Sequence, residues 1–304
     1  MATGRSLHIG VNYVKPENYD GNWGGNRLSC CEEDAGAMKT IAQQLKYTDP
    51  LILPTEEATL ERVRYEIAEI GKRLKGGDIF FLSFSGHGGQ VEDKPNGDET
   101  DDNKDETWAL RDGQLVDDEL YTMLSKFKKD VRVIVLSDSC HSGSVIANIL
   151  SLTNTSNMAS LTNTSNIAGL TNTLSLKRVE ESAKSEFPVR SIPHYVGTES
   201  EDRHKSYFDK IQKYNPLGDR IALQASVLLI SACTDFDEAR EGPQFGWFTG
   251  VLRYVWDNGA FPGTYWQFFN KIKLELDKVG QTPKYFRPPG NPGDFDKKLR
   301  PFVI

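Results

Sequence analysis

The sequence has few cysteines and no long apolar run, and each shortage excludes a class of protein. Its 304 residues include only four cysteines, Cys30, Cys31, Cys140 and Cys233, too few for a disulfide framework. No C-x-x-C or H-x-x-x-H spacing supports a zinc site. No run approaches the roughly 18 apolar residues of a membrane helix, and residues 1–6 lack a secretory signal pattern. We therefore expect a reduced cytoplasmic protein with no membrane contact.

The chain also lacks an excess of basic residues and the phosphate-binding loops of nucleotide enzymes. Its formal net charge is −7, whereas a domain that binds nucleic acid usually carries a basic face. No Gly-x-Gly-x-x-Gly or Gly-Lys-Ser/Thr loop follows an apolar run. Nucleic acids are therefore not expected as partners, and a nucleotide-binding α/β domain is disfavoured.

Two apolar segments of the same build each lead into small and polar residues. Residues 131–136 are apolar at nearly every position, which is typical of a strand buried on both faces of a parallel sheet. They lead to Cys140, and residues 78–84 lead in the same way to His87. Ligands and chemistry gather at the carboxyl ends of strands in open α/β sheets. We therefore expect His87 and Cys140 to leave one edge of the sheet side by side.

Cys140 and His87 together form the smallest unit that performs thiol catalysis. A cysteine attacks as the thiolate and needs a base or an imidazolium nearby. The glycines flanking His87 allow close approach of a substrate and offer N–H groups to an oxyanion. A small buried cysteine and a surface histidine are the alternative, but their matched positions favour catalysis. His141 is a poorer base, because sequence neighbours tend to point apart.

The motifs around these two residues resemble those of a known family. Ser-Gly-His-Gly at 85–88 and Asp-Ser-Cys-His-Ser-Gly at 138–143 are similar to the two active-site signatures of metacaspases and orthocaspases, which are caspase-like cysteine peptidases. The resemblance extends over about 7–143 and resumes over about 226–259, so it covers most of the chain. It implies a cysteine endopeptidase acting on polypeptides. A catalytically silent caspase-like scaffold is the alternative, although such proteins usually lose the cysteine or the histidine.

The resemblance also implies a mechanism. His87 would assist deprotonation of Cys140 or protonate the leaving amine, and Cys140 would attack the carbonyl carbon. The N–H groups of Gly88 and Cys140 would stabilise the oxyanion before water hydrolyses the acyl-enzyme. The sequence identifies no third catalytic residue beside His87 and Cys140.

A pocket for a basic side chain is a further implication of the resemblance. In metacaspases this pocket is made by a cysteine, an aspartate three residues later, and the Ser and Asp of the two signatures. The matching residues here are Cys31, Asp34, Ser85 and Asp138. A buried carboxylate favours a paired cation, although an aspartate at 138 that only orients a loop is the alternative. We therefore expect cleavage after Arg or Lys rather than after Asp.

The order of apolar patterns predicts the α/β fold class. Strands and helices alternate in the first half, which implies a parallel sheet with right-handed crossovers. The expected strands are 7–13, 51–53, 78–84, 131–136, 226–232 and an edge strand within 283–301. One expected helix begins at residue 31, and three others span 59–74, 245–256 and 265–279. The family resemblance implies a caspase-like three-layer sandwich, with a mostly parallel central sheet flanked by helices.

We expect a single monomeric domain with three regions. Residues 1–145 form a large-subunit-like catalytic region, 146–220 a linker or insertion, and 221–304 a small-subunit-like region. Cys233 follows the strand at 226–232 without a Ser-Gly-His partner, so a structural or loop role is expected for it.

The expected linker carries a short repeat and several basic residues. Leu-Thr-Asn-Thr-Ser-Asn occurs at 152–157 and again at 161–166, and so polar a unit cannot bury a core. Exposed linkers are preferred sites of proteolysis. Because the enzyme is expected to prefer basic residues, the candidate processing sites are Lys177, Arg178 and Arg190. The cut would be made by the chain itself or by a related protease.

An acidic segment at 92–106 raises the question of calcium. The resemblance assigns Asp105, Asp117 and Asp118 to a tentative calcium site, but its fourth position is Ala147. Calcium takes several oxygen ligands at once, whereas a run of acids is commonly a solvated loop. We expect no obligatory cofactor and weak or absent calcium dependence.

Overall fold

A computed structural model describes most of the chain. The described residues are 2–21, 23, 27–92, 104–140, 188–214, 222–234, 238–288 and 290–304. The predictions for His141, Ala147, Lys177, Arg178 and the repeats lie outside these residues, as does most of the acidic segment.

The centre of the molecule is a six-stranded sheet in the order β2-β1-β3-β7-β8-β9. Neighbouring strands are parallel except for the last pair, in which β9 runs antiparallel to β8 at the sheet edge. The bounds are β1 Gly4–Gly10, β2 Leu51–Leu53, β3 Ile79–Ser85, β7 Arg132–Asp138, β8 Ser226–Ser231 and β9 Lys284–Phe286. The predicted mostly parallel sheet with a late edge strand is confirmed.

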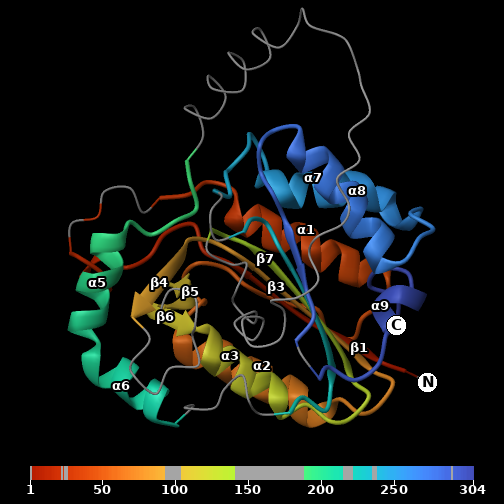
Figure 1. Cartoon of the computed structure of the whole chain (residues 1–304), viewed down its shortest axis with the longest axis horizontal. Helices are drawn as coiled ribbons and strands as arrows, with labels where there is room; N and C mark the ends of the chain where they lie inside the picture. The colour runs from red at the N-terminus through yellow and green to blue at the C-terminus, as the bar shows by residue number, and fades with distance from the viewer. Residues whose placement is uncertain are drawn as a thin grey trace, which may run out of the picture.

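Helices cover both faces of this sheet (Figure 1). On one side lie α1 (Cys31–Gln44), α7 (Trp247–Trp256) and α8 (Tyr265–Asp277), and on the other α2 (Leu60–Arg73) and α3 (Asp117–Ser125). Side chains that alternate along β3 serve the two faces: Phe81 belongs to the core beneath α1 and α7, and Leu82 to the core beneath α2. This is the period of two expected of a strand buried on both sides. The predicted three-layer sandwich is therefore confirmed.

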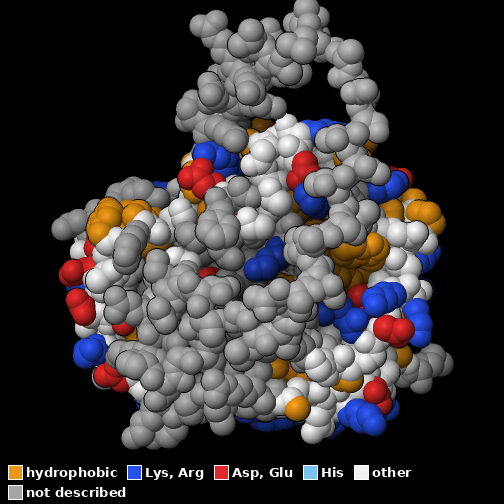
Figure 2. All heavy atoms as spheres, in the orientation of Figure 1, with side chains coloured by type: hydrophobic (Ala, Val, Ile, Leu, Met, Phe, Trp, Pro, Cys, Tyr) orange, Lys and Arg blue, Asp and Glu red, His pale blue; other side chains and the backbone are white. Residues whose placement is uncertain are grey.

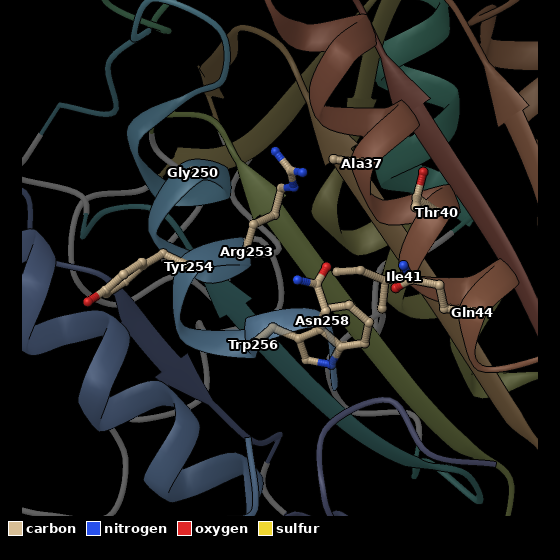
Figure 3. A pocket seen from close by; sticks show the side chains of 9 residues that line it. All are labelled: Ala37, Thr40, Ile41, Gln44, Gly250, Arg253, Tyr254, Trp256 and Asn258. Atoms are coloured by element: carbon tan, nitrogen blue, oxygen red, sulfur yellow. The ribbon is translucent and has the colours of Figure 1, made fainter. Parts of the chain in front are cut away.

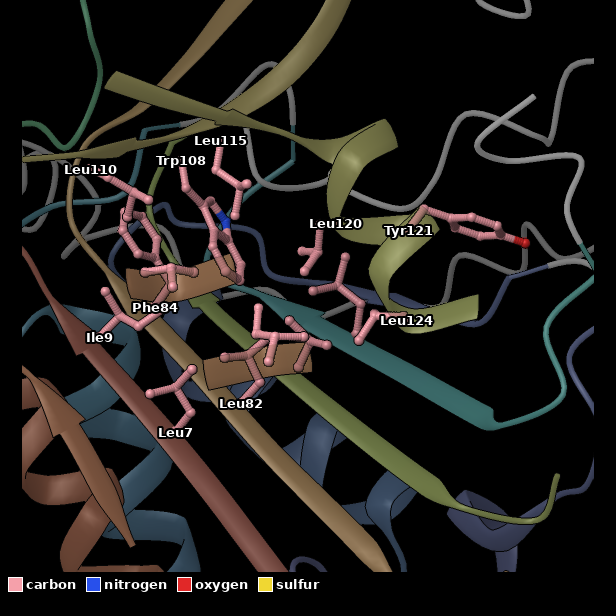
Figure 4. Close-up of a cluster of buried hydrophobic side chains, with 14 of the residues drawn as sticks. Leu7, Ile9, Leu82, Phe84, Trp108, Leu110, Leu115, Leu120, Tyr121 and Leu124 are labelled. Carbon is pink, nitrogen blue, oxygen red and sulfur yellow. The ribbon is translucent and has the colours of Figure 1, made fainter. Parts of the chain in front are cut away.

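A second, smaller sheet was not predicted. It consists of β4 (Gly88–Glu92), β5 (Lys104–Leu110) and β6 (Gly113–Val116), all antiparallel. Trp108 of β5 anchors it to the main core, because its ring stacks on Phe84 with centroids 4.7 Å apart and its Nε1 donates to Ser137 Oγ at 2.9 Å. Figure 4 shows Trp108 and Phe84 among the buried leucines.

Two helices also lie where only a linker was expected. They are α5 (His194–Arg203) and α6 (Lys205–Tyr214), beside the small sheet in Figure 1. Short elements complete the described fold: a 3-10 turn at Pro16–Asn18, another at Asp257–Gly259, and α9 at Phe295–Lys298.

Strand β1 begins and ends earlier than the predicted 7–13. It pairs with β3 from Gly4 to Gly10, and the start of α1 crosses the chain at Gly10. A Cβ atom on Gly10 would lie 2.4 Å from the carbonyl oxygen of Cys31, so only glycine allows this close approach.

None of the described helices is both long enough and apolar enough to cross a membrane. On the face drawn in Figure 2, acidic and basic side chains of the described residues are interspersed, and no broad basic patch is visible among them.

Candidate active site

The register of the two central strands brings His87 and Cys140 to the same sheet edge. Ser85 at the end of β3 pairs with Asp138 at the end of β7. His87 and Cys140 each follow two residues later, and the exposed fractions of their side chains are 1% and 0%. The expected placement at neighbouring strand ends is therefore what the structure shows.

Groups from distant parts of the chain surround the two side chains. The ring of His87 packs against Trp23, with centroids 4.7 Å apart. The sulfur of Cys140 accepts a hydrogen bond from the N–H of Ala239 at 3.0 Å. Cys233 is fully buried, and its sulfur lies 3.3 Å from the carbonyl oxygen of Ser139. The region after β8 thus packs directly against the strand end that carries Cys140.

Two backbone N–H groups converge on one carbonyl oxygen at this edge. The N–H groups of Gly88 and Cys140 both donate to the oxygen of Arg190, each at 3.0 Å. A Cβ atom on Gly88 would lie 1.7 Å from the carbonyl oxygen of Cys140, so a side chain at position 88 would force the strand ends apart. This pair of donors has the geometry that stabilises an oxyanion.

The family resemblance implies peptide hydrolysis, and the substitution Gly88→Ala is expected to lower that activity by about 10²-fold or more, the usual effect of losing one oxyanion donor. Gly36→Ala in α1 is the matched control, because nothing lies within 4 Å of its added methyl group and alanine favours a helix. Kinetic assays with thermal unfolding of both variants check this. Wild-type activity in Gly88→Ala would contradict the expectation.

The guanidinium group of Arg190 fills the acidic pocket implied by the resemblance. Its side chain is fully buried, with Nη2 2.8 Å from Asp34 and Nη1 2.9 Å from Asp138. Nη1 also donates to Ser85 Oγ at 2.9 Å. Cys31 is buried beside these groups, but it is the sulfur of Cys30 that lies 3.1 Å from Nη2. The structure thus gathers Asp34, Ser85 and Asp138 around one arginine.

Three further residues complete this pocket, and no local sequence pattern indicated them. Glu241 lies 3.8 Å from Nη2 of Arg190 and accepts from the backbone N–H groups of Ser29 and Cys30. Gly246 donates its N–H to Asp34 at 3.0 Å, and a Cβ there would lie 2.5 Å from Nη1. Thr249 donates twice to Asp138. All three belong to the region after β8.

The pocket contains more acids than bases. Asp34, Asp138 and Glu241 face a single guanidinium group, and all three are buried. Burial raises the pKa of Asp34 to about 7, against the opposing charge of Arg190 and with the help of the nearby Asp138. Burial also raises the pKa of Cys30, so this thiol stays neutral. Protonation of Asp34 would remove the negative charge closest to Nη2.

A pH dependence follows from this raised pKa. With an arginine in the pocket, Asp34 becomes neutral below about pH 7 and attracts that arginine less. For an arginine peptide, the substrate that the family resemblance implies, kcat/KM is therefore expected to fall. Charged hydrogen bonds of this kind contribute about 1.5–3 kcal/mol. The ratio of wild-type to Asp34→Asn activity should therefore widen to roughly tenfold or more above pH 7 and narrow towards acid pH. A ratio independent of pH would contradict this.

The backbone around Arg190 is bound in an extended form. The N–H of Arg190 donates to Ala239 at 2.9 Å, and the N–H of Glu241 donates to Pro188 at 3.1 Å. Val189 and Arg240 form the antiparallel bridge between these bonds. The peptide bond that follows Arg190 thus lies next to the Gly88 and Cys140 N–H groups, as an added strand lies along a binding groove.

This placement corrects one part of the prediction for the linker. Arg190 was expected in an exposed segment, but its side chain is 0% exposed. The reason is that three acids from distant segments provide it with charge partners, which local composition does not reveal. The processing sites Lys177 and Arg178 lie outside the described residues.

The calcium prediction stays untested. In the part of the chain that the structure describes, no group of three or more His, Cys, Asp or Glu side chains is placed to hold a metal ion. Asp105 and Asp117 are both buried, at the start of β5 and of α3. With Asp118, they do not by themselves form such a group.

A surface cavity of about 280 Å³ lies between α1 and α7 (Figure 3). Thr40, Gln44 and Arg253 are among its lining residues. The cavity shares no lining residue with the group of side chains that bind the guanidinium group of Arg190. The acidic pocket is not open in the same way, because the side chain of Arg190 occupies it.

The first half of the chain is similar to proteins of one known family. Residues 4–148 match the model of the metacaspase, peptidase C14 domain. Metacaspase-1 of Kluyveromyces lactis is 32% identical over 164 residues, covering 48% of this chain and 35% of that protein. Metacaspase-1A of Neurospora crassa is 35% identical over 159 residues, covering 47% and 32%. The matched part is thus only about a third of the length of these curated relatives.

A solved structure covers nearly the whole chain. The crystal structure of protein GSU0716 from Geobacter sulfurreducens is 36% identical, with a TM-score of 0.77, and the match covers 99% of each chain. The similarity therefore includes the region after β8 that the family model does not reach.

Proposed function

We propose that this chain, a metacaspase-like protein with the caspase fold, is a cysteine endopeptidase that cleaves after arginine and cuts its own Arg190–Ser191 bond. One observation carries the proposal. The carbonyl oxygen of Arg190 receives the N–H groups of Gly88 and Cys140, while its guanidinium group lies between Asp34 and Asp138. That is how an acyl group bound for thiol attack is held.

The mechanism assigns one role to each group. Cys140 attacks the carbonyl carbon as the thiolate, and His87 transfers the proton to the leaving amine. The N–H groups of Gly88 and Cys140 stabilise the oxyanion, and water then releases the acyl group. Asp34 and Asp138 act before this step by holding the basic side chain.

The shape of the pocket favours arginine over lysine. Separate nitrogens of Arg190 reach Asp34 and Asp138, and a planar fork satisfies both carboxylates at once, whereas an ammonium group is a single point charge. Both residues should be accepted, with arginine cleaved about tenfold faster, the effect of roughly one charged hydrogen bond.

Fluorogenic peptides that differ only in the residue before the reporter test this proposal. Arginine is expected to be cleaved first, lysine more slowly, and aspartate or leucine not at all. Mass spectrometry of the purified protein should show a fragment that begins at Ser191. Preference for an acidic or apolar residue, or hydrolysis without any such fragment, would contradict the corresponding half of the proposal.

A further inference from the structure

The residues that follow the proposed cut are anchored in the protein. The N–H of Ile192 donates to the carbonyl oxygen of Gly88 at 2.8 Å, and Ser191 bridges to Gly88 in parallel. The side chain of Ile192 is only 5% exposed and belongs to the core beneath α2, together with Val196 of α5. Ser191 therefore directly precedes a residue, Ile192, that is held by a backbone hydrogen bond and by burial of its side chain.

Polar contacts hold the helices behind this anchor. Ser200 of α5 is fully buried, donates to the carbonyl oxygen of Asn18 at 3.2 Å and accepts from Gln114 at 3.3 Å. Tyr207 of α6 joins an ion pair in which Arg64 binds both carboxylate oxygens of Glu119, at 2.6 and 3.0 Å. None of these contacts includes the Arg190–Ser191 bond, so cleavage of that bond leaves them in place.

From this arrangement we infer that the processed protein is an acyl transferase as well as a hydrolase, with its own new amino group on Ser191 as the acceptor. The inference rests on the proposed function. The segment 191–192 stays where the leaving side of a substrate would lie, so the Ser191 amine remains beside the carbonyl carbon of an acyl-enzyme. Peptide acyl groups that end in arginine are the donors.

The acyl transfer needs only the ester, Cys140, His87 and the Ser191 amine, and no oxidant or reductant. The Cys140 thiolate attacks a peptide ester, so that a C–S bond forms as the C–O bond of the ester breaks, and the leaving alkoxide takes the proton that His87 carries and departs as the alcohol. The Ser191 amine then attacks the thioester carbonyl, so a C–N bond forms as the C–S bond breaks. The proton lost by the amine returns to the sulfur, through His87. The product is a chain extended at Ser191, which is again a substrate for cleavage.

The short tether gives the amine an advantage over an amine in solution. Flexible tethers provide effective concentrations of about millimolar, and well-oriented partners reach about 10⁵ M. Ser191 is held through Ile192 on one side only, so we expect the effective concentration of its amine to lie between these two values. Self-cleavage should accordingly be reversible until residues 191–192 move away from Gly88.

The experiment uses the purified, self-processed protein and acetyl-Pro-Val-Arg ethyl ester, which copies residues 188–190. An ester is chosen because ethanol is small enough to leave while residues 191–192 stay bound. After a quench within seconds, the fragment that begins at Ser191 is expected to carry the acyl mass in about a tenth or more of the molecules, with fragmentation placing it on the Ser191 amine. The free peptide Ser-Ile-Pro-His at the same concentration should be acylated about 100-fold less.

A pair of variants tests the anchor. Ile192→Ala should lower the acylated fraction about tenfold relative to ester hydrolysis, while Leu274→Ala, on the exposed face of α8, should leave the ratio unchanged. Ester hydrolysis with no acyl mass at Ser191, acylation of lysines only, or an unchanged ratio in Ile192→Ala would each overturn the inference. Absence of both hydrolysis and the Ser191 fragment would instead overturn the proposed function.

Discussion

Replacement of Cys140 by alanine is expected to leave the chain uncut and to lower peptide hydrolysis by about 10⁴-fold or more, as removal of a catalytic nucleophile does. The other three cysteines have different contacts. The sulfur of Cys30 lies against the guanidinium group of Arg190, burial raises the pKa of Cys31, and the sulfur of Cys233 contacts the carbonyl oxygen of Ser139. Mass spectrometry and fluorogenic assays of the same preparation measure both effects.

The control for this variant is Cys233→Ala. Both cysteines are fully buried, and each follows a central strand, β7 or β8. Both alanine variants should therefore lose similar packing, so a general loss of stability would affect the two alike. If Cys233→Ala were inactive and Cys140→Ala active, the assignment of the nucleophile would be wrong.

The main sheet could be predicted because its signal is local. Strands such as β3 and β7 are apolar along nearly their whole length, and helix α2 places Val63, Ile67 and Ile70 on one face. The periodicity of the apolar residues and the length of the segment suffice to recognise such elements. The register of β3 with β7 followed from the matched motifs at their ends.

The small sheet was missed because its strands have a mixed composition. The strand β5 has the sequence Lys-Asp-Glu-Thr-Trp-Ala-Leu, in which the first residues are charged and only the last three are apolar. It is stabilised by antiparallel pairing with β4 and β6 and by the stacking of Trp108 on Phe84. These are tertiary contacts, which override local propensity.

The residues themselves indicated the site only at strand ends, whereas Asp34 in α1 was predicted through the family resemblance. His87, Cys140, Ser85 and Asp138 all lie at or just after strand ends, and the structure brings them together. Glu241 and Arg190 do not, since Glu241 binds Ser29 across 212 positions and Arg190 binds Asp34 across 156. A basic residue in a polar segment indicates a site of proteolysis in general, but not which bond enters the pocket.

Removal of the charge on Arg190 is the second large effect expected. In Arg190→Gln the glutamine offers no charge to Asp34, Asp138 and Glu241, so these buried acids are left without a cation, and breaking a buried ion pair costs about 3–5 kcal/mol. Cleavage of the 190–191 bond should slow by about 10²–10³-fold or more. Arg190→Lys keeps one charge and should be cut about tenfold more slowly than the wild type.

A surface arginine in the same segment supplies the matched control for Arg190→Gln. Arg203 pairs with Glu199 at 3.1 Å, and the two side chains are 40% and 51% exposed. Exposed pairs of this kind contribute at most about 1 kcal/mol. Arg203→Gln should therefore be processed at the wild-type rate. The time course of the fragment starting at Ser191 compares the three variants. Equal rates in Arg190→Gln and Arg203→Gln would show that the buried guanidinium group does not position the bond for attack by Cys140.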